Sequence, residues 1–424
     1  MHLHVRLASA SLLMLLAACG GGGGADPGAG ATPPNPLSSP GTMVSVTFLG
    51  SLPNAVAVAP SNGVFTASTL SSNKLTFLVP AGTNAYAFAV ACPAVNVSGT
   101  LIAEYVFEAN LSDGATYSVS PCFAPAAATG AATGAFDVSA IPGAVKARIA
   151  GAQGYSGDVN GTTGTFSVSM PVGTNDIAVL ALDGGGNVLA VRMLRSQIVP
   201  GSVNAGATIV VNAADEVSTE AVTVMGVPPG FPTPPALNAG YLTANGTFLS
   251  LNNGSAFAYP ALSPADLSAL DQYQINSNSS NTSINEAIGT TLFAVVGNPV
   301  TLTYPPAWTY TPPAAAVFPT FSFVYSGFRG LATQTYRGQI AWPAGVNTTD
   351  QLTVFASAAY LGTQTSVAIP NLTALPGFFG SAATAVTVNW LAEIDGGTFQ
   401  SYIVPAPAPG SLSYVQARGT YVEP

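Results

Sequence analysis

The chain has 424 residues with a formal net charge of −9, and only 6% of the residues are charged. Nine scattered basic side chains provide no positive surface for nucleic acid, and so few charges cannot cover the solvent faces of many helices. Short neutral side chains with 45 Gly and 34 Pro favour strands and tight turns, so the sequence predicts an all-β fold.

Residues 1–18 have the pattern of an export signal, because Arg6 precedes an apolar run that is too short to span a bilayer. The run ends in Leu16-Ala17-Ala18-Cys19, which resembles the lipobox of bacterial lipoproteins. The resemblance implies cleavage before Cys19 and acylation of this cysteine, which anchors the protein in a membrane. Gly20 stands where aspartate implies inner-membrane retention in Gram-negative lipoproteins, so the outer membrane is expected. The alternative is an ordinary signal peptide with a chance cysteine.

Residues 19–43 contain a run of glycines followed by several prolines and few apolar side chains. Such a segment cannot hold a fixed backbone or form a core. We therefore expect a flexible, lipidated tether between the membrane and the first folded domain.

Two segments of the chain repeat each other. Residues 76–89 and 165–181 both read as a strand, a Pro-x-Gly-Thr-Asn turn and a second strand. The flanking sequences also agree, so 44–122 and 135–225 are predicted to be two copies of one β-sandwich module. This pattern is similar to bacterial surface repeats with immunoglobulin-like or prealbumin-like sandwiches, which implies spacer or binding modules.

Cys92 and Cys122 lie at the ends of strand-like runs in the first module. An exported protein meets an oxidising compartment, so we expect the two cysteines to form one disulfide. The alternative is a pair of buried free thiols.

Residues 226–236 are rich in proline and predict a stiff linker. The remaining residues, 237–424, carry all three tryptophans and 11 of the 15 tyrosines, and predict one large or two small sandwiches. Ser263, followed by Pro264 and an early acid, predicts a short turn of helix in this region.

Tyr304, Trp308 and Tyr310 are the candidate binding residues, because the prolines around them exclude a central strand and place them on a loop or a sheet edge. Aromatic rings in that position can stack on sugars or on a protein partner. The alternative is that Trp308 closes the end of a sandwich core.

No histidine follows His4, which excludes Ser-His-Asp catalysis and histidine-bound zinc in the rest of the chain. Carboxylate chemistry remains: Glu393 and Asp395 alternate on one strand and could face a second acid across a cleft. The second acid would be one of three: Glu286, Asp350 or Asp271. Acids that flank a turn are the simpler interpretation.

Two acidic loops, around Asp158 and Asp183, offer oxygen ligands for calcium, but plain Asx-turns account for them better. We therefore expect no metal, no cofactor and no catalytic residue.

The sequence thus predicts a non-enzymatic, membrane-anchored extracytoplasmic lipoprotein, with spacer modules and a C-terminal domain that binds a glycan or an envelope protein. The alternatives are a carboxylate-dependent polysaccharide hydrolase or lyase, and an accessory component of an outer-membrane assembly.

Overall fold

The computed structural model describes residues 41–61, 63–96, 99–122, 128–152, 156–232, 235–251, 257–308, 310–324, 334–379, 385–396 and 410–423. These residues are almost entirely strands, and the predicted all-β fold with tandem sandwiches is confirmed. The helical elements are α1 (Ala358–Leu361) and two 3-10 turns, η1 (Val203–Gly206) and η2 (Ala213–Asp215). In the part of the chain that is described, no helix has the length and apolar character needed to cross a membrane.

The first sandwich packs two sheets around a core that includes Phe77, Tyr86, Phe88 and Tyr117. One sheet has the order β4-β1-β8 and the other contains β3-β2-β5-β7, with β6 paired to β7. The strands are β1 (Thr42–Phe48), β2 (Ala55–Ala59), β3 (Thr66–Ser68), β4 (Lys74–Val79), β5 (Ala85–Ala91), β6 (Val95–Asn96), β7 (Thr100–Asn110) and β8 (Thr116–Val119).

The main strands of the second sandwich repeat this topology. Its sheet β11-β10-β13-β14 corresponds to β3-β2-β5-β7, and β12-β9-β16 corresponds to β4-β1-β8, with the β9–β16 pair parallel like β1–β8. The strands are β9 (Thr129–Asp137), β10 (Lys146–Ala150), β11 (Ser156–Asn160), β12 (Thr163–Pro171), β13 (Gly173–Leu182), β14 (Val188–Val199), β15 (Gly201–Ser202) and β16 (Ile209–Val210). The two segments that align in sequence therefore share a fold.

The repeated proline turn joins β4 to β5 and β12 to β13. Gly82 and Gly173 have φ angles of 82° and 121°, which residues with a Cβ rarely adopt. Asn175 donates its side-chain amide to the carbonyls of Pro171 and Gly173 at 2.8 and 3.0 Å. The turn chemistry expected from the sequence is therefore present in the second copy, including the bond from asparagine back to the main chain.

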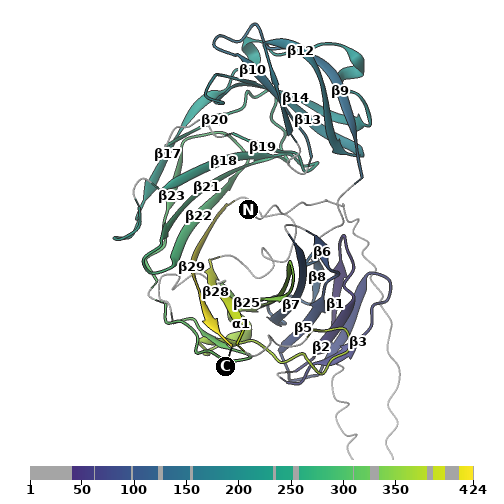
Figure 1. The fold of residues 1–424 in the computed structure, drawn as a ribbon, viewed down its shortest axis with the longest axis vertical. Helices are drawn as coiled ribbons and strands as arrows, with labels where there is room; N and C mark the ends of the chain where they lie inside the picture. The colour runs from purple at the N-terminus through teal and green to yellow at the C-terminus, as the bar shows by residue number, and fades with distance from the viewer. Residues whose placement is uncertain are drawn as a thin grey trace, which may run out of the picture.

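Most of the remaining strands extend the first sandwich into one large sheet. Its order is β19-β18-β21-β22-β29-β28-β25-β26-β7-β5-β2-β3, and Figure 1 shows its strands following a curved path from β18 through β29 to β7. Two smaller sheets, β20-β17-β23 and β24-β27, complete the C-terminal part. The strands are β17 (Ser218–Met225), β18 (Ala236–Leu242), β19 (Phe248–Ser250), β20 (Ala258–Ala261), β21 (Gln272–Asn281), β22 (Glu286–Ala294), β23 (Val300–Thr303), β24 (Thr320–Ser322), β25 (Thr335–Gly345), β26 (Thr348–Ser357), β27 (Ser366–Ala368), β28 (Thr387–Asp395) and β29 (Gly410–Val422).

The cores of these parts are continuous with one another. The parallel pair β7–β26 joins the first sandwich to the C-terminal sheet, and side chains of β13 and β14 share a core with Tyr241 and Tyr273. Both faces of β5 and β13 are buried, because alternate positions such as Ala87 and Ala89 are small enough for a second layer to approach. The linkers and domain boundaries expected from the sequence remain predictions, but the sandwiches are packed together.

The short helix predicted at Ser263 is wrong. The segment forms a turn in which the Asp266 amide donates to the Ser263 carbonyl at 3.0 Å and the Ser263 hydroxyl donates to the Asp266 carboxylate at 2.8 Å. Asp266 also accepts the amide of Met193 at 2.8 Å, so its side chain is committed to β14 rather than to a helical turn.

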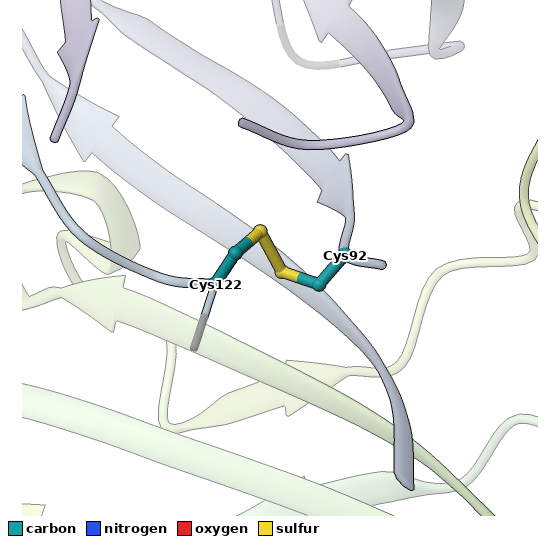
Figure 2. Close-up of a disulfide and its surroundings, with 2 residues drawn as sticks. All are labelled: Cys92 and Cys122. Atoms are coloured by element: carbon teal, nitrogen blue, oxygen red, sulfur yellow. A yellow bond between two sulfur atoms is a disulfide. The ribbon is translucent and has the colours of Figure 1, made fainter. Parts of the chain in front are cut away.

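The predicted disulfide between Cys92 and Cys122 is present, with Cα atoms 5.2 Å apart. Figure 2 shows that it joins the end of β5 to the segment that follows β8. Because β5 and β8 belong to different sheets, the bond links the two sheets of the first sandwich. Both cysteines are buried and form part of its core.

Candidate binding site

Of the three aromatic residues singled out in the sequence, Tyr304 and Trp308 are buried and Tyr310 is partly buried. Tyr304 and Trp308 are only 4% and 3% exposed, and they belong to the core between the large sheet and the segments that cover it. The Tyr310 ring packs against Trp390 with centroids 5.4 Å apart, and its amide donates to Glu286 at 3.1 Å. Tyr304 and Trp308 therefore offer no free face to a ligand, and the alternative interpretation of Trp308 as a core residue fits its position.

Glu393 and Asp395 do share one face of β28, as the alternation predicts. Glu393 pairs with Gln416 in the neighbouring strand, whereas Glu286 pairs with Ala417 and therefore lies on the other face of the sheet. Asp350 pairs with Trp342, a core residue on that same opposite face. Neither acid can face Glu393 across a cleft.

Asp271, the third possible partner acid, belongs to a buried network at the junction with the second sandwich. Arg195 contacts Asp271 at 2.7 Å and Asp176 at 3.1 Å, and the Tyr241 hydroxyl donates to Asp271 at 2.7 Å. Asn245 donates to Asp176 from the β18–β19 loop at 3.0 Å. Buried charges that are fully paired in this way hold elements together, so the network is structural.

The loop acids considered as calcium ligands are also committed to protein partners. The Asp183 carboxylate accepts the amides of Gly185 and Asn187, both at 2.8 Å, in an Asx-turn. The side-chain amide of Asn187 also donates to the Asp183 carboxylate, at 2.7 Å. Together these hydrogen bonds lower the pKa of Asp183, and the one from the Asn187 side chain contributes most. Asp158 is ion-paired with Arg148 at 2.6 Å.

A polar surface lies on the face of the large sheet opposite the Trp308 core, over the central strands β25, β28 and β29. Arg337 Nη1 lies 3.5 Å from Glu393 Oε1, and Gln416 donates to the other oxygen of Glu393 at 2.8 Å. Arg337 also donates to Gln339 at 2.5 Å and lies 5.7 Å above the ring of Phe355. Alternation along three adjacent strands brings these side chains together.

Next to this network is an open depression of about 410 Å³. The same face of the three strands supplies most of its lining: Gln339, Asn389, Leu391, Arg418 and Thr420, with Asn285, Trp390 and Gly419 completing it. The walls thus present amide, hydroxyl and guanidinium groups around one aliphatic side chain. Such a lining can hydrogen-bond a hydroxylated ligand, whereas an apolar ligand would leave these groups without partners.

The sequence pattern did not reveal these residues. Gln339, Asn389 and Arg418 lie far apart in the chain, and each is an ordinary outward-facing strand residue by its alternation. Only the pairing of β25 with β28 and of β28 with β29 brings them to one place.

The comparisons add no relative to this geometry. No protein-family model matches the chain, and no curated protein sequence matches it significantly.

Proposed function

We propose that the protein is an extracytoplasmic lipoprotein, anchored through Cys19, whose C-terminal part binds a saccharide. The N-terminal sandwiches act mainly as structural modules that carry the binding surface away from the membrane. The lipobox-like sequence ending at Cys19 supports the anchor, and it lies outside the described residues.

The observation that carries the binding proposal is the polar depression on β25, β28 and β29. Asn389, Arg418 and Thr420 are exposed there, and Gln339 lies beside them. Amide, hydroxyl and guanidinium groups can donate to and accept from the closely spaced hydroxyls of a sugar, and Leu391 offers an apolar contact for the ring carbons. No large aromatic side chain of the kind that dominates protein–protein interfaces is exposed among the lining residues.

Direct binding measurements against soluble oligosaccharides test this proposal. The double variant N389A/T420A removes two exposed polar side chains of the depression and is expected to weaken binding at least tenfold. The matched control, N160A/T163A, removes the same two side-chain types from exposed positions on the second sandwich and should bind as the native chain does. Equal binding by both variants, or no saccharide binding by the native protein, contradicts the proposal.

The anchor has its own test. Metabolic labelling with a palmitate analogue should mark the native protein and leave Cys19→Ala unmarked, with the variant released from the membrane fraction. Identical labelling and fractionation of the two forms would contradict the proposed lipid anchor and would leave the binding proposal unaffected.

A further inference from the structure

The pairing of the basic side chains distinguishes one of them. The chain has nine lysines and arginines, and all except Arg6 and Arg329 lie within the described residues, which leaves seven. Five of the seven are ion-paired with a carboxylate: Lys146, Arg148, Arg192, Arg195 and Arg337. In the described part of the chain, Lys74 and Arg418 have no such partner.

Nearly all the acidic residues of the chain also lie within the described ranges. Of the 18 acidic residues, only Asp26 falls outside the described ranges. None of these described acids lies within ion-pair distance of Arg418. Among the arginines of the described residues, Arg418 alone has no carboxylate within ion-pair distance.

Arg418 lines the depression, together with Gln339, Asn389 and Thr420. Its main-chain amide is already bonded to the Asn285 carbonyl at 3.1 Å, which fixes the backbone from which the guanidinium extends. The nearest acid on that face, Glu393, is engaged by Arg337 and by Gln416. The guanidinium of Arg418 is thus a free cation inside a ring of neutral polar groups.

We infer that Arg418 binds the carboxylate of an acidic saccharide, such as a uronic acid residue, while the neighbouring amides and hydroxyl bind its ring hydroxyls. This inference rests on the proposed saccharide-binding function and specifies the ligand class. A guanidinium meets a carboxylate with two parallel N–H···O bonds, which a neutral sugar cannot form. An acidic protein repels anions in general, so binding of an anionic ligand requires a local contact of this kind.

The experiment compares uronic acid oligosaccharides with their methyl esters, which have the same ring hydroxyls but no charge. The native protein should bind the acid about tenfold more tightly than the ester, and the preference should shrink as salt concentration rises. R418Q should bind acid and ester equally, at the affinity of the native protein for the ester. R418K should retain only part of the preference, because its ammonium keeps the charge without the two-pronged geometry.

K74Q is the matched control, because it removes the other unpaired cation from the distant strand β4 with the same change in net charge. It should keep the full preference. The inference is overturned if the native protein binds acid and ester equally, or if R418Q keeps the preference; in both cases saccharide binding itself stands. If the native protein binds neither ligand nor any neutral saccharide, the proposed function falls with it.

Discussion

Arg337 and Glu393 lie directly opposite each other on β25 and β28, with Nη1 3.5 Å from Oε1. Their side chains are only 18% and 8% exposed, so water screens the pair poorly. The guanidinium of Arg337 also covers the ring of Phe355 on β26. The pair therefore links three adjacent strands beneath the polar surface.

Arg337→Met keeps the length of the side chain but leaves the Glu393 carboxylate buried without its cation. We expect this change to lower the free energy of unfolding by about 2–3 kcal/mol, measured by urea denaturation. Glu393→Gln in the same background should recover part of the loss, because it removes the uncompensated charge. A loss in Arg337→Met that the second substitution does not relieve would show that packing, not charge, is responsible.

Glu104 should make the protein less stable as pH rises. Burial raises the pKa of this carboxyl from about 4.5 to about 8, although the amide of Phe379 donates to it and acts in the opposite direction. Because the folded state holds the proton more tightly than the unfolded chain, this contribution is complete below about pH 4.5 and is lost as pH rises toward about 8. Burial also raises the pKa of Glu108 on the same strand to about 8, so it acts in the same direction.

Glu104→Gln should flatten this part of the dependence, since glutamine keeps an oxygen for the Phe379 amide and cannot ionise. Thermal melting at a series of pH values between about 4.5 and about 8 measures this dependence of stability on pH. Glu108→Gln should remove a separate part of the slope. A native chain whose stability increases steadily over this interval would refute the assignment.

The disulfide between Cys92 and Cys122 closes a loop with a sequence separation of 30. A loop of that length restricts the unfolded chain enough to stabilise the fold by about 3–4 kcal/mol. The double variant C92A/C122A should melt at a lower temperature and should no longer respond to reducing agent, whereas the native protein should respond. Equal melting of native protein with and without reductant, after loss of the bond is verified by mass spectrometry, would contradict this estimate.

Phe355 should couple the C-terminal sheet to the first sandwich. Its ring stacks on Phe107 and Tyr105 across the β7–β26 pair, with centroids 5.5 and 6.4 Å apart. Phe355→Ala should cost about 2–3 kcal/mol and should speed amide hydrogen exchange in β5, which belongs to the first sandwich. Leu78→Ala is the control, because that side chain is 48% exposed on β4. Unchanged exchange in β5 would mean that the two parts open independently.

Local chemistry in the sequence predicts much of the fold. Composition predicts an all-β chain, the repeated turns around Gly82 and Gly173 predict two related sandwiches, and the environment of Cys92 and Cys122 predicts their bond. Each of these depends on residues that are close in sequence or on the general properties of the chain. The partner of a strand edge is different, because alternation tells which face is buried but carries no information on which strand lies alongside. The sequence pattern therefore does not predict the pairing of β7 with β26.

The candidate site shows the same limit. The prolines around Trp308 predict that this residue lies on a loop or a sheet edge. Burial of its ring, however, depends on segments that cover it from elsewhere in the chain. Arg418 is inconspicuous in the sequence, because the property that distinguishes it, the lack of a nearby carboxylate, depends on how distant strands pair.

The parallel contact between β7 and β26 also constrains the order in which the protein can be assembled. The strands of the first sandwich all precede Cys122, whereas the strand that covers the outer edge of β7 runs from Thr348 to Ser357. Until β26 pairs with it, the backbone edge of β7 is open and can recruit strands of other chains. Folding of the first sandwich alone therefore leaves one strand edge uncovered, and a segment much further along the chain closes it.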